Sequence, residues 1–384
     1  MKKPILSVIA LVLLLILVLS GGSFHFMPKG GQVDAESVEA VNPENETSAK
    51  EGSETELAEE TPETPETEEP EIYELSFIGD ITPDSVQFYR NTPQAYQNVV
   101  KQDNLGYVFE KTRQLFENDY FTIGNFECVL SDRDLANKSK NFVFKAPTAY
   151  TGIMTEGSVE FVTLGNNHVL DYGEDGYADT KAALDSAGIA YAGRDEHTIY
   201  EREGGLKIGV YADSFSTVEK IQKGVAALKK EGAEFIIVAL HWGDEGAYKV
   251  NSMQQTQGHA AIDAGADVVY GTHPHTLQPI ELYKGKYIFY SCGNWSFGGN
   301  TDPRDKDTVA IKLKVERQAN GNIVMTKLDV IPCASSGVLK GNNYQPVLVE
   351  ESDERYQRIL SKINGSFEGA NLEIGYTYGV GELG

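Results

Sequence analysis

From Tyr73 onward, short apolar runs alternate with amphipathic stretches, a pattern typical of strands and helices in turn. Most of the runs are apolar throughout, as expected for strands that are covered on both faces. The pattern therefore predicts one α/β domain. The expected strands are residues 73–79, 120–124, 160–165, 207–212, 234–240, 267–271 and 286–291.

The clearest helix is expected over residues 215–230, where apolar residues recur at helical spacing beside lysines. A closing helix is expected over residues 351–363. Residues 308–333 instead alternate by twos around an Asn-Gly-Asn stretch at 320–322, which predicts an antiparallel hairpin. The sequence thus predicts a mixed sheet, or two sheets packed together.

The N-terminus has the layout of an export signal. Lys2 and Lys3 precede a run from Ile5 to Leu19 that has no charge and one polar side chain. This run is shorter than the roughly 20 residues that span a bilayer, but the following residues extend it. We expect residues 1–26 to be an uncleaved cell-membrane anchor that places the domain on the extracellular side. Cleavage near Ser20, which would give a secreted protein, is the alternative.

The next segment is strongly acidic. From Asp34 to Glu74 there are sixteen acidic residues and one lysine. Such a segment buries too little apolar surface to fold, so residues 27–73 are expected to be a disordered linker. The whole chain has a formal net charge of -24. Nucleic acid is not an expected partner, because affinity for it comes mainly from lysine and arginine.

The chain has three cysteines, Cys128, Cys292 and Cys333. They are too few and too widely spaced for a disulfide framework or a zinc ribbon. We expect buried free thiols, because cysteine is among the most buried residue types. A bridge between Cys128 and Cys292 remains the alternative.

Side chains of metal-ligating type follow five of the predicted strands. Any one of them has an ordinary explanation, such as a helix cap or a turn. Sites in α/β sheets, however, form at the carboxyl ends of strands, so their coincidence there predicts one functional site. The residues are Asp80, Asn125, Glu127, Asn166, Asn167, His168, Asp171, His241, Glu245, His273 and His275.

The pair His273 and His275 carries the metal argument. In an extended segment residues i and i+2 point the same way, so both imidazoles should face one side, stiffened by Pro274. Two protonated imidazoles would repel each other, whereas a shared cation satisfies both. Histidines with carboxylates and an amide suit zinc, manganese or iron better than calcium. We expect one divalent ion, or two ions in adjacent sites that share a bridging carboxylate.

The residues named above belong to short motifs that follow one another along the chain. The motifs are "FIGDI" (77–81), "GNFE" (124–127), "FKAP" (144–147), "LGNNHVLDYG" (164–173), "AGR" (192–194), "HWGDE" (241–245), "AIDAGADVVYGTHPH" (261–275) and "IFYSCGNWSFG" (288–298). Taken in this order, they resemble the motifs of the bacterial CapA family of poly-γ-glutamate capsule proteins. The resemblance implies a variant of the calcineurin-type metallophosphoesterase fold, a four-layer αββα sandwich, here expected over residues 74–340 with a C-terminal helix and tail at 341–384.

The resemblance also implies roles for individual residues. It places Glu127 in a bridging position and turns His168 toward the substrate; we further expect Asp171 to orient His168. Where the wider phosphoesterase pattern has Asp-x-His, this chain has Asp80 followed by Ile81 and Thr82. Because of that departure, we expect either that only one metal is firmly held or that Glu245 replaces the missing imidazole as a ligand. The implied metal ligands are Asp80, Glu127, Asn167, His241, His273 and His275.

The function expected from these observations is a cell-surface, metal-dependent hydrolase of poly-γ-glutamate biosynthesis or processing. Its substrate would be an anionic polymer such as poly-γ-glutamate, cut at the γ-glutamyl amide. One alternative is a non-catalytic factor that binds or exports the polymer for a membrane synthase. Another is an extracellular phosphoesterase, the activity that the fold analogy favours.

Overall fold

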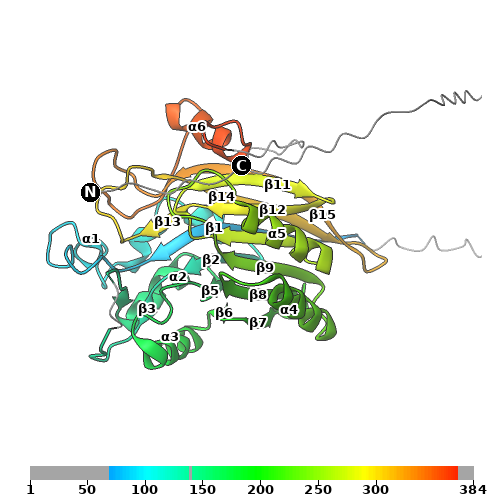
Figure 1. Cartoon of the computed structure of the whole chain (residues 1–384), viewed down its shortest axis with the longest axis horizontal. Coiled ribbons are helices and arrows are strands. Elements are labelled where there is room, and N and C mark those ends of the chain that lie inside the picture. Colours follow the sequence, from blue (N-terminus) through cyan, green and yellow to red (C-terminus); the bar gives the residue numbers. More distant parts are fainter. Residues whose placement is uncertain (1–68, 138–140, 371–384) are drawn as a thin grey trace, which may run out of the picture. The chain divides into compact units, whose positions relative to one another are not determined.

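The computed structural model describes residues 69–137 and 141–370 (Figure 1). The predicted membrane segment and nearly all of the predicted linker fall within residues 1–68, outside the described part. Across the described ranges, no helix combines the length and the apolar character needed to cross a membrane.

Two mixed sheets form the centre of the domain, which confirms the predicted α/β class. The larger has the strand order β16-β15-β14-β1-β2-β5-β6 with β13 beside β1, the smaller has the order β11-β12-β10-β9-β8-β7, and β3 pairs with β4. The strands are β1 Glu71–Thr82, β2 Phe121–Phe126, β3 Val129–Leu130, β4 Lys145–Ala146, β5 Phe161–Thr163, β6 Ala190–Ala192, β7 Glu196–Tyr200, β8 Ile208–Ser214, β9 Phe235–His241, β10 Val268–Thr272, β11 Leu277–Tyr283, β12 Lys286–Cys292, β13 Asn294–Phe297, β14 Asp307–Arg317, β15 Ile323–Ala334 and β16 Val347–Leu348.

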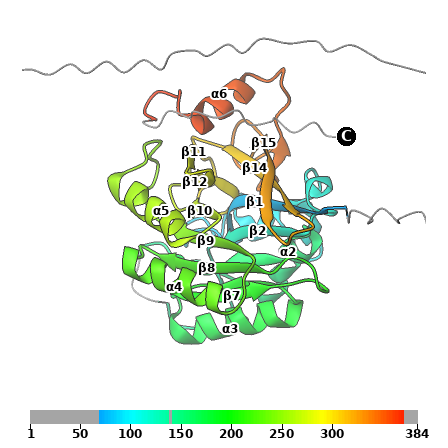
Figure 2. The same cartoon turned by 90° about the vertical axis from the view of Figure 1, so that its right-hand side faces the viewer.

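Helices α1 to α5 cover the outer faces of the two sheets. The helices are α1 Tyr96–Val99, α2 Gly152–Glu156, α3 Gly173–Ala187, α4 Val218–Lys230, α5 Ser252–Ala264 and α6 Glu354–Ile363, with short 3-10 turns at Leu105–Val108, Arg113–Leu115 and Thr148–Thr151. Helices α1 to α3 pack on the larger sheet, while α4 and α5 lie along the smaller one (Figure 2).

The layers explain why the strands are apolar throughout. In β1, Phe77 points into the core between the two sheets, while Ile78 points into the core beneath α1 to α3. In β9, Ile237 and Val238 divide in the same way between the inter-sheet core and the α4–α5 side. Successive side chains of a strand point to opposite faces, so a strand buried on both faces needs apolar residues at every position.

The central strands run parallel, which brings their carboxyl ends to the same edge. In the larger sheet β1, β2, β5 and β6 are parallel neighbours, and in the smaller sheet β8, β9, β10 and β12 are. The register pairs Asp80 with Asn125 across β1 and β2, and His241 with Thr272 across β9 and β10. The polar residues at strand ends are therefore gathered by the topology itself.

Most element boundaries differ from the prediction by a few residues, and two of the differences have a visible cause. Strand β1 begins at Glu71, within the expected linker. Glu71 lies opposite Arg317 in the antiparallel pairing of β1 with β14, and the two side chains also form an ion pair. Helix α4 begins at Val218 rather than 215, because the Thr217 hydroxyl accepts a hydrogen bond from the Lys220 amide and caps the helix there. Phe215 instead lies outside the helix, half exposed.

The predicted C-terminal helix is present and packs on the sheets. Helix α6 packs against β11, β14 and β15. Its residues Ile359 and Ile363 are fully buried members of the core between the two sheets. The three cysteines are free and buried, which confirms the predicted thiols and removes the alternative of a Cys128–Cys292 bridge.

Gly79 allows the chain to pass close to Gly293 just before the first site residue. A Cβ added at Gly79 would lie 2.0 Å from the Gly293 carbonyl oxygen, and that oxygen also accepts the Asp80 amide at 3.0 Å. We expect Gly79→Ala to lower the free energy of unfolding by about 2 kcal/mol, since the backbone must shift to relieve the clash. Urea unfolding measures the change.

Gly106→Ala is the matched control, because the nearest atom to its added Cβ is the Glu156 Cβ at 3.6 Å, an ordinary contact. Equal stabilities of the two variants would show that the approach of β1 to Gly293 is not a tight one.

Candidate functional site

The site lies where the carboxyl ends of the two sheets' parallel strands come together. Asp80 stands in β1, Glu127 directly after β2, and His241 at the end of β9. His273 and His275 occupy the turn between β10 and β11, and Asn167 and His168 follow β5. Segments up to about two hundred positions apart in the chain thus supply one cluster, as sites of α/β sheets do.

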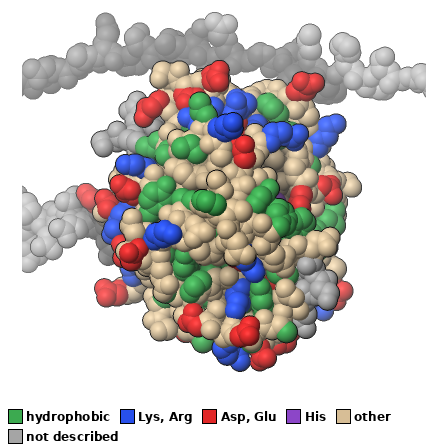
Figure 3. Space-filling model, turned by 90° about the vertical axis from the view of Figure 1, so that its left-hand side faces the viewer, with side chains coloured by type: hydrophobic (Ala, Val, Ile, Leu, Met, Phe, Trp, Pro, Cys, Tyr) green, Lys and Arg blue, Asp and Glu red, His purple; other side chains and the backbone are tan. Residues whose placement is uncertain are grey.

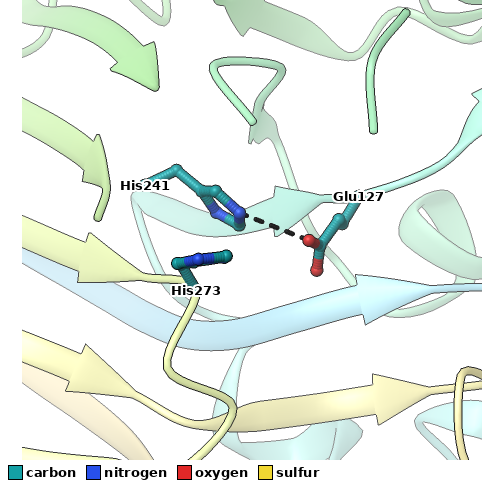
Figure 4. Close-up of side chains that lie close together, drawn as sticks. All are labelled: Glu127, His241 and His273. Atoms are coloured by element: carbon teal, nitrogen blue, oxygen red, sulfur yellow. Dashed lines mark ion pairs between the residues drawn. The ribbon is translucent and has the colours of Figure 1, made fainter. Parts of the chain in front are cut away.

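Three side chains form the first group of close ligand atoms. Figure 4 shows the Glu127 carboxylate and the His241 and His273 imidazoles pointing toward one another. The Glu127 Oε1 lies 3.3 Å from the His241 Nε2, and the two imidazole centroids are 4.5 Å apart. One potential ligand atom from each of the three lies within 4.8 Å of the others. All three residues are buried.

A second group shares Glu127 with the first. Asp80, Glu127 and His275 also bring one ligand atom each within 4.8 Å, and the Asp80 Oδ2 lies 3.2 Å from the His275 Nδ1. A third group joins the exposed Glu245 to His273 and His275. The carboxylate of Glu127 therefore lies between two three-residue groups, and Glu245 approaches the paired histidines.

Several polar atoms of these groups are buried without a hydrogen bond to any described residue. They are both carboxylate oxygens of Glu127, the Asp80 Oδ2 and the His273 Nδ1. Two of them, the Glu127 Oε1 and the Asp80 Oδ2, do contact imidazole nitrogens, at 3.3 and 3.2 Å, as ion pairs. Buried polar atoms are normally hydrogen-bonded, so the cluster favours a further partner, above all for the Glu127 Oε2 and the His273 Nδ1. A divalent cation held by nitrogen and oxygen donors fits them, as it would in zinc, manganese or iron sites.

The electrostatics of the cluster follow from burial and proximity. Burial alone would raise the pKa of Glu127, but His275 and His241 lower it below its ordinary value. Burial lowers the pKa of His273 to about 3, helped by the neighbouring His241. Burial also opposes the charge on His275, yet Glu127 and Asp80 raise its pKa to about 10. The surroundings thus favour the charged forms of Glu127 and His275 and the neutral form of His273.

The geometry of the two histidines corrects one step of the sequence argument. His273 and His275 do not lie in an extended segment: their φ angles are 97° and 56°, and the segment is a turn. The imidazoles are brought together, with centroids 6.0 Å apart, by that turn rather than by strand alternation. Positive φ is uncommon for residues other than glycine and costs on the order of 1 kcal/mol, and such strain collects at functional sites.

His168 and Asp171 form a separate pair at the edge of the cluster. The His168 Nδ1 lies 2.7 Å from the Asp171 Oδ2, and that same oxygen accepts the Phe144 amide at 2.8 Å. The His168 Nε2 faces Glu127, 4.0 Å from its Oε1. The Asp171 carboxylate is thus fixed by the backbone and in turn fixes the orientation of the His168 ring.

The remaining predicted ligand, Asn167, also lies in the cluster. Its Oδ1 is 2.8 Å from the His241 Nε2, the nitrogen that faces Glu127. The structure therefore brings together all eight residues singled out from the sequence as metal ligands or catalytic groups.

Supporting residues around the cluster were not assigned roles from the sequence. Asn125 donates to the Asp80 Oδ1 at 2.7 Å and accepts from Thr163 at 2.9 Å. The Asn294 Oδ1 lies 2.9 Å from the His275 Nδ1. Such partners orient metal-binding side chains. Asn125 and Asn294 both stand in motifs quoted above, "GNFE" and "IFYSCGNWSFG". Their polar side chains beside apolar strand residues are the feature of the sequence that could have identified them as supporting residues.

A pocket opens beside the cluster. Its volume is about 410 Å³, and His168 and His275 form part of its wall. Three phenylalanines line it, Phe142, Phe144 and Phe297, and the charged side chains on its lining are Glu245, Arg304 and Asp305. A substrate bound in this pocket would meet the imidazoles of the cluster directly.

Comparisons with known proteins agree on the family. The chain is 30% identical over 296 residues to the capsule biosynthesis protein CapA of Bacillus anthracis, covering 69% of each chain. It is 27% identical over 309 residues to the PGA biosynthesis protein CapA of Bacillus subtilis (strain 168), covering 73% of this chain and 78% of that protein.

Among solved structures, the NAD nucleotidase of Haemophilus influenzae is similar at a TM-score of 0.38 and 13% identity, over 80% of this chain and 57% of that one. A similarity this loose assigns no role to any residue. The model of the family described as "Bacterial capsule synthesis protein PGA_cap" matches residues 74–298. The chain belongs to this family of bacterial capsule synthesis proteins.

Proposed function

We propose that this protein is a metal-dependent hydrolase of poly-γ-glutamate biosynthesis that cuts the γ-glutamyl amide of the polymer at the cell surface. The substrate class is suggested by the family and by the names of its CapA relatives. The proposal includes a metallophosphatase-like scaffold for the layers described above. It also includes an N-terminal membrane anchor at residues 1–26. The observation that carries it is the buried Asp80–Glu127–histidine cluster at the wall of a pocket.

The residues that would hold the metal are the six candidate ligands, Asp80, Glu127, Asn167, His241, His273 and His275. When bound, a divalent metal supplies a water of lowered pKa and polarises the carbonyl to be attacked. In amide hydrolysis the water oxygen bonds to the carbonyl carbon, the carbon–nitrogen bond breaks, and the leaving nitrogen takes up a proton. The chain must therefore provide a proton donor near that nitrogen.

His168 is placed to provide that proton. It lines the pocket, its Nδ1 is held by Asp171, and its Nε2 faces the cluster. The Asp171 carboxylate holds the ring so that its Nε2 faces the cluster, and from there the imidazole would pass a proton to the leaving nitrogen. Asp171 acts through His168 and is a positioning residue.

The test incubates the purified full-length protein with poly-γ-glutamate and Mn²⁺ or Zn²⁺. The rate of hydrolysis is measured from the amino groups that are released. We expect His168→Ala to reduce the rate by about 100-fold or more, because proton transfer contributes at least that much. Polymer affinity and metal content should remain close to wild type.

His259→Ala is the matched control, since His259 also contacts a carboxylate, that of Glu281 at 2.9 Å, but stacks on Tyr283 away from the cluster. Full activity in His168→Ala would overturn the mechanism. Polymer binding without any turnover by wild type would support the non-catalytic export factor instead, and cleavage of a phosphodiester alone would support a phosphoesterase.

A further inference from the structure

Arg304 stands at the pocket wall in an unusual electrostatic situation. Every other arginine of the described part forms an ion pair with an acidic side chain. They are Arg90, Arg113, Arg133, Arg194, Arg202, Arg317, Arg355 and Arg358. Arg304 has no such partner among the described residues, although the chain is acidic, with a net charge of -24. An exposed guanidinium that no described acid pairs with is available to bind a solute.

The acids that flank Arg304 are held elsewhere. Asp302 lies 3.6 Å from the Lys306 Nζ and accepts the Gly341 amide at 2.7 Å. Asp305 accepts from the buried Lys362 at 2.6 Å and from the Tyr248 hydroxyl at 2.7 Å. Both neighbouring carboxylates thus have partners other than Arg304, and these contacts hold the loop that carries it.

The rest of the pocket wall near the imidazoles is aromatic. The Phe144 ring lies edge-on to the His168 ring at 4.7 Å, and the Phe297 ring lies 4.5 Å from the His275 ring. Phe142 is half exposed at the same pocket. The pocket therefore combines one unpaired cation, apolar walls and the imidazoles of the metal cluster.

This combination matches one class of ligand. A carboxylate binds the planar guanidinium through two parallel hydrogen bonds, and aromatic walls cover methylene groups. A γ-linked glutamyl unit has both features, because its α-carboxylate stays free while two methylenes separate it from the amide that is cut. A phosphate also binds a guanidinium, but inorganic phosphate has no methylenes for the aromatic walls to cover.

A local cation also answers an electrostatic difficulty. On the face shown in Figure 3, acidic and basic side chains of the described residues are interspersed rather than gathered by sign. A polyanion approaching an acidic protein gains little from such a surface. A single arginine freed from ion pairing, next to a cation-binding cluster, provides the attraction where it is needed.

We propose that Arg304 binds a free carboxylate of the polymer chain while Phe142, Phe144 and Phe297 cover its methylenes, so that Arg304 sets the preference for a carboxylate-bearing substrate. This inference rests on the function proposed above and names the residue that selects the substrate. Arg304 would act in binding, and the proton transfer at His168 does not depend on it.

The experiment measures the affinity of the full-length protein for poly-γ-glutamate by calorimetry with Mn²⁺ present, and checks the polymer length by light scattering after each titration. We expect Arg304→Ala to raise Kd about 10-fold and Arg304→Lys to raise it less, because lysine keeps the charge but loses the paired hydrogen bonds. Arg113→Ala removes the same charge from an exposed arginine that pairs with Glu117 and Glu156, and should change Kd less than 2-fold.

A methyl-esterified polymer completes a thermodynamic cycle. If Arg304 contacts the carboxylate, wild type and Arg304→Ala should bind the ester equally weakly. Equal affinity of wild type and Arg304→Ala for the acid polymer, or equal losses in Arg304→Ala and Arg113→Ala, would overturn the assignment and leave the proposed function intact. An effect of Arg304→Ala on inorganic phosphate binding alone would also overturn it. Absence of polymer binding by wild type would overturn both proposals.

Discussion

Replacing Glu127 with glutamine is expected to abolish the stabilisation that divalent metal gives to the wild-type protein. Glu127 belongs to two of the three groups of close ligand atoms, and both of its oxygens are buried without a hydrogen bond to a described residue. An amide keeps one neutral acceptor and turns a donor toward His241 or the metal. We therefore expect the affinity for Mn²⁺ or Zn²⁺ to fall by more than about 100-fold, beyond the usual effect of mutating residues that support a ligand.

Thermal unfolding at increasing metal concentration measures this loss. A metal present at one hundred times its Kd stabilises the native state by about 2.7 kcal/mol, and that gain should be missing in Glu127→Gln at the same concentration. The residue lies between the Asp80–His275 and the His241–His273 sides of the cluster. Its loss should therefore affect both positions, whereas Glu245→Gln should affect at most one.

Glu281→Gln is the matched control for Glu127→Gln. The Glu281 carboxylate also lies beside an imidazole, that of His259, and accepts the Tyr290 hydroxyl at 2.6 Å. It belongs to none of the groups of ligand atoms found in the described ranges. A metal-induced shift that persists in Glu127→Gln, or that disappears equally in Glu281→Gln, would contradict the placement of the metal.

The convergence of the site could be predicted because it follows from strand direction. Asp80, Glu127 and His241 each stand at or just beyond the carboxyl end of an apolar strand. Once those strands are parallel, their ends meet without any further information. The same local pattern also located the β14–β15 hairpin, which pairs in antiparallel register as the alternation predicts.

Other features depend on contacts that local patterns do not encode. His273 and His275 both have positive φ in the turn, a conformation that could not be predicted from the residue type histidine. Arg304 has no ion pair with the acids of residues 69–137 and 141–370, which depends on where Asp302 and Asp305 point, and Asp305 is held by a lysine 57 positions away. Phe215 fits the apolar spacing of α4 but lies before its cap, with its ring 5.1 Å from His273.

The charge cluster that anchors α6 gives the second large effect. Asp307, at the start of β14, accepts hydrogen bonds from Arg358 at 2.7 Å and from Lys362 at 2.7 Å, and both Asp307 and Lys362 are almost fully buried. Replacing Asp307 with asparagine would leave the buried Lys362 with Asp305 as its acidic partner. Because breaking a buried ion pair typically costs about 3 to 5 kcal/mol, we expect a loss of about 3 kcal/mol in the free energy of unfolding.

The pH dependence of that loss identifies its cause. Burial alone would raise the pKa of Asp307, but hydrogen bonds from Arg358 and the charge of Lys362 lower it below its ordinary value. A lowered native pKa gives stability that is present above the unfolded pKa of about 4 and is lost as the pH falls through the native pKa. Urea unfolding should therefore show a large difference between wild type and Asp307→Asn at pH 7 that shrinks below about pH 4.

Asp263→Asn provides the comparison, since its ion pair with Lys284 is exposed on both sides and should contribute little to stability. A loss in Asp307→Asn no larger than in Asp263→Asn would mean that the buried charges do not fasten α6 to β14. A large loss that persists unchanged at low pH would point to packing rather than charge. Lys362 of the same charge cluster also donates to Asp305, which stands next to Arg304 at the pocket wall. The contacts that hold α6 on β14 therefore also hold the loop that carries Arg304.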